Sequence, residues 1–284
     1  KKLCSRLLGR WQAMYHRSSI QMVLSSSFTA VAVTGMIFLG LTLFLRFSHA
    51  TNAQMAESSR RVLSQVNLNM YRYLRDMMRI SDTVYYKVIK DTDLAEASLD
   101  DALELLWESS REGVVSIAVF SGDGELIAAA PLQELKNSVT PERAEERIEN
   151  LHFSTPHVQD LFEDPDYRYR WVVSLSRQVE LTRAGNIQSG VLLVDMSFGG
   201  IEQICKDVDL GHSQGYLYLT DRSGEIIYHP RQQLIYAGLL EENNLTAAGY
   251  TDGTHTEKFQ GQTRQVTVKT VGYAGWKLVA VVPS

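Results

Sequence analysis

The sequence predicts an α+β protein: an N-terminal transmembrane helix, a long stalk helix and two tandem modules, each built on an antiparallel sheet. Three observations predict this fold. An uncharged apolar run lies near the N-terminus, a helical heptad pattern follows it, and a strand–turn–strand unit occurs around Gly124 and again around Gly224. We expect five parts: a cytoplasmic basic tail, the transmembrane helix, the stalk helix, a membrane-distal module and a membrane-proximal module. They are residues 1–17, 18–47, 48–93, 94–204 and 205–284.

The membrane helix is predicted from residues 18–45, which contain no charged side chain. About 20 apolar helical residues span the hydrocarbon core, so this run is long enough. The 17 residues before it carry five basic side chains and no acidic one. The positive-inside rule then places the residues after about 47 outside the cytoplasm, in a single- or multi-pass protein of the cell membrane. A secretory signal cleaved near Ala50 is the alternative, although such signals have shorter apolar cores.

The stalk is predicted because residues 50–90 contain neither Pro nor Gly and carry apolar residues at spacings of three and four. This spacing is the seam of a helix that packs on another element. The seam residues are Leu63, Val66, Met70, Tyr73, Met77, Ile80 and Val84. We expect this seam to form a parallel homodimer with an identical stalk, with the upper part of the helix also packed on a domain of its own chain. Packing on the chain's own domain alone is the alternative. A second helix is expected over residues 94–110.

The two modules are predicted from a duplicated pattern. Each copy begins with an apolar strand, a turn that ends in glycine and a returning strand, which together read as a hairpin. A polar stretch and two more strands follow in each copy. The predicted strands are 114–120, 125–130, 169–180 and 190–196 in the first copy, and 215–220, 225–230, 265–271 and 276–282 in the second. The duplication predicts two small antiparallel sheets backed by helices, linked by a helix over residues 199–208.

This order of parts resembles the extracytoplasmic double Cache sensor regions of bacterial membrane receptors, over about residues 20–284. The motifs Trp171–Arg177, Gly190–Met196 and Gly224–Pro230 look most like those of YesM-type sensor histidine kinases. The resemblance implies two PAS-like modules, a small ligand in the distal one, and a second membrane helix and kinase after this segment, as in two-component systems. The alternatives are a methyl-accepting chemoreceptor, a diguanylate cyclase or a membrane-tethered binding module without signalling.

The sequence contains no motif for catalysis in this segment. It has no P-loop, no dinucleotide-binding glycine motif and no nucleophile elbow. Its seven histidines lack the usual ligand spacing, so we expect neither a metal nor a cofactor. Residues after 47 carry 22 basic and 33 acidic side chains, and this acidic balance argues against nucleic acid as a partner.

The candidate ligand site combines aromatic rings, guanidinium groups and one carboxylate. Rings supply apolar walls and guanidinium groups pair with carboxylates, a combination that suits small polar ligands. Asp195 ends an apolar strand, where it could hold an ammonium or hydroxyl group. The candidate residues are Trp171, Asp195, Tyr169, Arg168, Tyr167 and Arg170. The ligand is expected to be a sugar, an amino acid or another small metabolite. Alternatively, Trp171 and Tyr169 are core residues and Asp195 caps the following helix.

Overall fold

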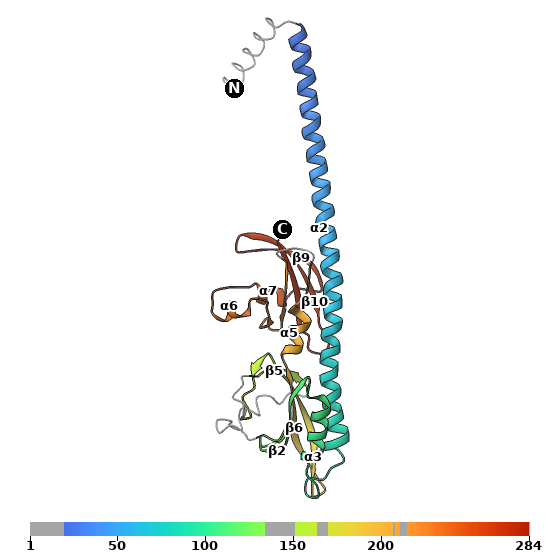
Figure 1. Cartoon of the computed structure of the whole chain (residues 1–284), viewed down its shortest axis with the longest axis vertical. Coiled ribbons are helices and arrows are strands. Elements are labelled where there is room, and N and C mark those ends of the chain that lie inside the picture. Colours follow the sequence, from blue (N-terminus) through green and yellow to red (C-terminus); the bar gives the residue numbers. More distant parts are fainter. Residues whose placement is uncertain (1–19, 134–150, 164–169, 207, 211–214, 284) are drawn as a thin grey trace. The chain divides into compact units, whose positions relative to one another are not determined.

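The computed structural model describes residues 20–133, 151–163, 170–206, 208–210 and 215–283 (Figure 1). The chain divides into two units, Lys1–Met55 and Ala56–Ser284. Helix α2 (Ile20–Val84) begins in the first unit and continues into the second. The second unit contains two sheets and the remaining helices.

The helical part of the first unit is apolar and exposed. Its segment Met22–Phe47 is long and apolar enough to cross a membrane. The hydroxyl groups within it donate to backbone carbonyls of the same helix: Thr29 to Ser25 at 2.8 Å and Thr34 to Ala30 at 2.7 Å. Because these polar side chains are satisfied locally, they are compatible with an apolar environment.

In the second unit, α2 buries one stripe of side chains. The buried apolar residues are Leu63, Val66, Met70, Leu74, Met77 and Val84. The helix lies against both sheets, since Arg60 Nε donates to Thr254 Oγ1 at 3.1 Å and Tyr73 donates to the Ser197 carbonyl at 3.0 Å. The seam therefore packs on the chain's own domain. A homodimer through the stalk helix stays a prediction, and it would have to use residues of α2 other than this buried stripe.

The end of the stalk departs from a regular α-helix. A π-helical turn, η1 (Tyr85–Ile89), follows α2. The next helix, α3 (Asp100–Ser110), begins six residues later than predicted. The Asp93 carboxylate explains the delay, because it accepts from the backbone N–H groups of Ala95, Ala184 and Gly185 at 2.7–2.9 Å. These bonds tie the chain after η1 to a distant turn and leave residues 94–99 outside a helix.

The first sheet has the strand order β2-β1-β6-β5-β3, with β4 also paired to β5, and all pairs are antiparallel. The strands are β1 (Val114–Ser121), β2 (Leu126–Ala130), β3 (His152–Phe153), β4 (His157–Val158), β5 (Trp171–Arg183) and β6 (Asn186–Ser197). Helix α3 packs beside β1, where Trp107 Nε1 donates to the Val115 carbonyl at 3.1 Å. The central strands β1, β6 and β5 are largely buried.

The second sheet repeats this arrangement in the order β8-β7-β11-β10-β9. Its strands are β7 (Tyr216–Thr220), β8 (Ile226–Tyr228), β9 (Gly253–Phe259), β10 (Gln262–Thr270) and β11 (Lys277–Pro283). Helix α5 (Gly199–Lys206) leads into it, and α6 (Gln232–Tyr236) and α7 (Asn244–Ala248) lie between β8 and β9. The α+β class with two antiparallel sheets is confirmed, and the linking helix is as predicted. Strand β9 was not predicted.

Candidate functional site

Asp195 lies on β6, in the middle of the first sheet, and is only 2% exposed. Its neighbours across the two adjacent strands are Ser116 on β1 and Ser174 on β5. Ser116 Oγ donates to Asp195 Oδ2 at 2.9 Å, and Ser174 Oγ donates to Oδ1 at 2.5 Å. Residues directly opposite each other in antiparallel strands share a face of the sheet. Three strands thus bring one carboxylate and two hydroxyls together below the surface.

Two residues from the segment before β5 extend this group. The Ser154 hydroxyl oxygen accepts from the Ser174 backbone N–H at 2.8 Å. His157 Nε2 lies 3.3 Å from Ser174 Oγ, and its Nδ1 lies 2.9 Å from the carbonyl oxygen of Thr155. We call Asp195, Ser116, Ser174, Ser154 and His157 the Asp195 cluster.

An apolar group lies on the same face of the sheet as Asp195. It comprises Ala118, Phe120, Ala129, Leu161, Phe162, Val191 and Leu193. Leu161 and Phe162 come from the segment between β4 and β5, so this segment covers that face. Binding sites for small molecules combine such apolar walls with a few fixed polar groups, and the Asp195 cluster with its apolar neighbours has this composition.

The structure does not bring the predicted ligand-binding residues Trp171 and Asp195 together. Trp171 begins β5, three residues before Ser174, and side chains alternate along a strand, so Trp171 and Asp195 project from opposite faces of the sheet. Trp171 is 42% exposed and stacks on Tyr236 of α6, with ring centroids 6.4 Å apart. It is therefore not a core residue. Arg170 precedes β5 and is exposed.

The remaining predicted residues, Tyr167, Arg168 and Tyr169, lie outside the described residues. The alternative role of Asp195 as a helix cap does not apply, because the hydroxyl of Ser197 lies at that position and accepts from the Gly199 N–H at 3.3 Å.

The hydroxyls of the cluster were missed at the sequence level. Ser116 and Ser174 each interrupt a run of apolar residues in a central strand. A small hydroxyl side chain in the middle of a fully buried strand needs a polar partner, and this signal could have located both serines. Nothing in the local sequence of His157 indicates a partner on β5.

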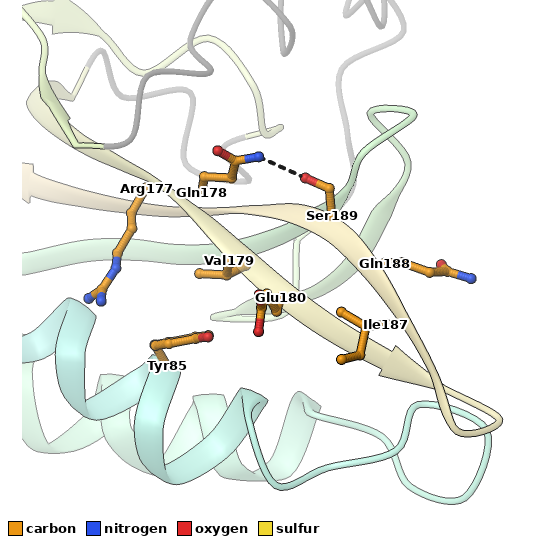
Figure 2. A pocket seen from close by; sticks show the side chains of 8 residues that line it. All are labelled: Tyr85, Arg177, Gln178, Val179, Glu180, Ile187, Gln188 and Ser189. Carbon is orange, nitrogen blue, oxygen red and sulfur yellow. Dashed lines mark hydrogen bonds between the residues drawn. The ribbon is translucent and has the colours of Figure 1, made fainter.

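A cavity of about 550 Å³ lies where the end of the stalk meets the hairpin of β5 and β6 (Figure 2). Arg177 points toward η1 there, with its guanidinium 5.0 Å from the centroid of the Tyr85 ring, and it forms an ion pair with Asp82. Across the strands, Gln178 donates to Ser189 at 3.1 Å. Arg177 on β5 thus links the sheet to the end of the stalk through an ion pair and a cation–π contact.

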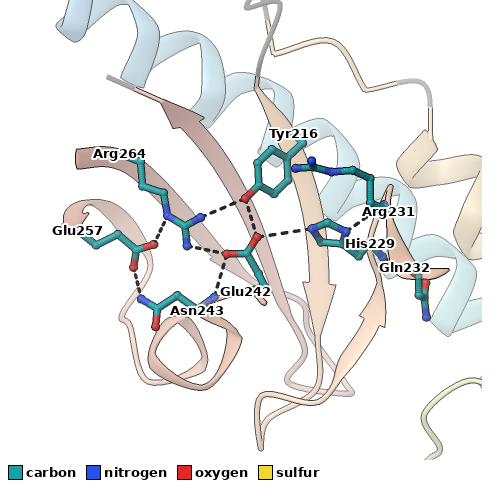
Figure 3. A network of polar contacts seen from close by, with 8 residues as sticks. All are labelled: Tyr216, His229, Arg231, Gln232, Glu242, Asn243, Glu257 and Arg264. Atoms are coloured by element: carbon teal, nitrogen blue, oxygen red, sulfur yellow. Dashed lines mark hydrogen bonds and ion pairs between the residues drawn. The ribbon is translucent and has the colours of Figure 1, made fainter. Parts of the chain in front are cut away.

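The second module contains a network of charged side chains beside a cavity of about 640 Å³ (Figure 3). Arg264 donates to Glu242 and to Glu257 at 2.6 Å each, and to Tyr216 at 3.1 Å. Tyr216 in turn donates to Glu242 at 2.6 Å, and His229 Nε2 lies 3.5 Å from the same carboxylate. We call these five residues the Arg264 clasp. It ties the segment between β8 and β9 to the sheet.

Glu242 is the most strongly perturbed carboxyl group of the clasp. Burial alone would raise its pKa, but hydrogen bonds from His229, Tyr216, the Asn243 backbone and Arg264 outweigh burial and hold the pKa at about 2. Glu242 is therefore a carboxylate at neutral pH, and its charge is balanced by a group of the same chain. Among the residues that the structure describes, no three metal-ligating side chains come together.

Comparison with known proteins identifies the fold family. The family model of the Cache domain matches residues 47–284. A protein of Bacillus thuringiensis subsp. konkukian, named as a probable methyl-accepting chemotaxis protein, is 22% identical over 277 residues, which are 96% of this chain. The alignment covers 40% of that relative, so the chain spans less than half of its length. This relative gives no support to a histidine kinase.

Two solved structures from Pseudomonas aeruginosa PAO1 share the fold. They are the ligand-binding domains of the amino acid chemoreceptors PctC, in complex with GABA, and PctB, in complex with L-arginine. The first has a TM-score of 0.56 at 17% identity and covers 82% of this chain and 99% of its own. The second has a TM-score of 0.59 at 16% identity and covers 81% and 88%. Since the family model also matches most of the sequence, the chain belongs to the Cache domain family.

Proposed function

We propose that this chain is the extracytoplasmic ligand-sensing region of a transmembrane receptor, and that its distal module binds a small ligand through an ammonium group held by Asp195. The observation that carries the proposal is the buried carboxylate of Asp195, held by the hydroxyls of two neighbouring strands beside an apolar group. Met22–Phe47 anchors the chain, with the basic N-terminal flank in the cytoplasm. Residues 94–204 form the distal module and residues 205–284 the proximal one.

The charge of the site favours an amino acid over a sugar. A ligand ammonium can donate charge-assisted hydrogen bonds to the oxygens of a buried carboxylate, whereas a sugar carries no positive charge. The ligands bound in the PctB and PctC structures support this choice, because L-arginine and GABA both contain an ammonium group.

The receptor type proposed is a chemoreceptor. The chemotaxis relative favours it, while a YesM-type histidine kinase rests on the sequence motifs around Trp171, Gly190 and Gly224 alone. Ligand binding is expected to alter the packing of the distal sheet on α2, and such coupling is typically worth about 1–3 kcal/mol. A homodimer stays a prediction, and it would have to use a surface other than the buried seam of α2.

The test is ligand screening with the full chain in lipid nanodiscs. The twenty L-amino acids, GABA and a set of neutral sugars are screened by thermal shift, and binding is then measured by calorimetry. Asp195→Asn keeps the shape of the side chain and removes its charge, so it should weaken binding roughly thirtyfold or more. Asp123→Asn, in an exposed turn of the same module, is the matched control. Equal affinity in Asp195→Asn and Asp123→Asn, or binding of sugars alone, would contradict the proposal.

A further inference from the structure

We propose that Ser176 is a specificity-determining residue of the ligand site. Its hydroxyl group forms a hydrogen bond with the side chain of the bound ligand, so the site selects amino acids whose side chain carries a hydroxyl or an amide group. This inference rests on the proposed function and names the class of ligand more closely.

The hydroxyl group of Ser176 is buried and has no partner in the part of the chain that the structure describes. Ser176 is 2% exposed, and among the described residues no donor or acceptor forms a hydrogen bond with its Oγ. Most buried polar side chains in proteins do have such a partner. The Ser176 hydroxyl is therefore a candidate contact for a bound molecule.

Ser176 lies on the same face of the first sheet as Asp195. It follows Ser174, whose hydroxyl donates to Asp195, by two residues on β5, and alternate residues of a strand share a face. The next residue, Arg177, points the other way, toward the stalk (Figure 2). Two residues of a strand extend about 6.6 Å, so Ser176 lies one step along the sheet from the carboxylate that we propose to hold the ammonium group.

This spacing suits an α-amino acid. The ammonium nitrogen lies about 2.8 Å from the carboxylate oxygen that accepts from it, and a hydroxyl or amide group of a short side chain follows within a few bonds of about 1.5 Å each. Leu193 is directly opposite Ser176 on β6 and belongs to the apolar group on this face. A ligand side chain that extends from Asp195 along the apolar group therefore passes Ser176.

The second sheet shows that the fold itself does not require a polar side chain at this position. The two hairpins correspond at an offset of one hundred residues, and the strand pairing extends this correspondence to the neighbouring strands. The corresponding pairs are Ser116 and Tyr216, Asp195 and Val281, Ser174 and Val266, and Ser176 and Val268. Val268 is 1% exposed and packs in an apolar cluster. The first module thus has a buried hydroxyl where the second has a packed valine.

The surroundings of Ser176 favour a neutral polar side chain over a charged or an apolar one. A charged side chain buried beside a single hydroxyl group would lose much of its hydration free energy. An apolar side chain would leave the hydroxyl group without a partner, and a site built to bond a polar group discriminates against the analogue that lacks it. We expect the polar ligand to bind about tenfold more tightly, or more, than its apolar isostere.

The first measurement needs no ligand. If Ser176 has no partner within the protein, Ser176→Ala removes no hydrogen bond, so it should lower the Tm of the full chain in nanodiscs by less than about 3 °C. Ser81→Ala is the matched control, because Ser81 on α2 is also buried and its Oγ has no hydrogen-bond partner among the described residues. A larger fall in Ser176→Ala alone would reveal a bond within the protein and overturn the inference, whatever the fate of the proposed function.

The second measurement compares the strongest ligand of the screen with its apolar isostere by calorimetry, for example L-threonine with L-valine or L-asparagine with L-leucine. Ser176→Ala should weaken binding of the polar ligand about tenfold and change that of the isostere less than about twofold, while Ser81→Ala should keep the wild-type preference.

Equal losses for both ligands in Ser176→Ala, or a preference that this variant retains, would contradict the inference and leave the proposed function intact. So would a strongest ligand whose side chain is apolar, charged or missing, as in GABA. If no amino acid binds at all, the proposed function fails, and the inference fails with it.

Discussion

The Arg264 clasp should make the second module sensitive to acid, and the sensitivity can be assigned to Glu242. The side chains of Arg264 and Glu242 are only 9% and 2% exposed, so each depends on the other for its charge balance. The pKa of Glu242 falls from its ordinary 4.5 to about 2. A carboxyl whose folded-state pKa is lowered contributes stability above its unfolded pKa, and this stability is lost as pH falls through the folded value. The loss should therefore lie between about pH 4.5 and pH 2.

The magnitude follows from the same numbers. One pKa unit corresponds to about 1.4 kcal/mol, so the drop from 4.5 to about 2 is worth about 3 kcal/mol at most. The free energy of unfolding of the second module should fall by up to that amount across this pH range. Urea unfolding of the full chain in nanodiscs, followed by tryptophan fluorescence, measures it, since Trp276 is buried in this module.

Two variants decide whether Glu242 is responsible. Glu242→Gln removes the titrating group and one of the two carboxylates that Arg264 contacts. Because Arg264 keeps Glu257 at 2.6 Å, stability at neutral pH should fall by less than the roughly 3–5 kcal/mol of a fully unpaired buried charge, and the corresponding acid transition should disappear. Glu241→Gln changes the exposed neighbour and should alter stability by less than about 0.5 kcal/mol. The reasoning is refuted if Glu242→Gln keeps the wild-type acid dependence, or if the two variants behave alike.

Three further outcomes are expected. Trp171→Ala removes the stack on Tyr236, so it should lower the free energy of unfolding by about 0.5–1.5 kcal/mol. Amino acid affinity should change by less than about twofold. A larger loss of affinity in folded protein would show that Trp171 contributes to the ligand site. Met70→Cys should give no crosslink between chains under oxidation, because Met70 is buried in its own domain. Arg72→Cys, at an exposed position of the same helix, is the control for crosslinking at the surface. Burial raises the pKa of the Cys205 thiol to about 12, so Cys205 should react with iodoacetamide at about pH 8 only after denaturation.

Much of the fold could be predicted because its signals are local. The hairpins are fixed by apolar strands around glycine turns, and at Gly224 the backbone adopts φ +92°, which favours glycine. Strand β9 escaped prediction because Gly253–Phe259 is mostly polar and lies at the edge of its sheet. The heptad pattern correctly indicated a buried stripe on α2. It could not identify what covers the stripe, because a sheet of the same chain and a second helix require the same spacing.

The site was harder to predict because it depends on strand register. Asp195 meets Ser116 and Ser174 across 79 and 21 residues of sequence, and only the pairing of β1, β6 and β5 places the three side chains opposite one another. The same register decides that Trp171 faces away from Asp195. Periodicity assigns a residue to a face within its own strand, but it does not relate the faces of two strands.

The duplicated fold offers a reason why a ligand ammonium is not expected to bind the buried carboxylate of the second module. The two hairpins correspond at an offset of one hundred residues, with the turn bonds Ser121 N–H to Glu125 and Asp221 N–H to Glu225 in the same places. This offset aligns Ser116 with Tyr216. Each of these residues donates a hydroxyl to a carboxylate: Ser116 to Asp195 and Tyr216 to Glu242.

Glu242 already has a cationic partner within its own module. Glu242 receives two charge-assisted contacts within its own module, from Arg264 at 2.6 Å and from His229 at 3.5 Å, so a ligand ammonium would have to displace a guanidinium. Asp195 accepts hydrogen bonds from the hydroxyl groups of Ser116 and Ser174. The residues at the equivalent positions 116 and 216 thus contact carboxylates from different elements: Tyr216 contacts Glu242, which belongs to a structural clasp, and Ser116 contacts Asp195, which we propose to hold a ligand.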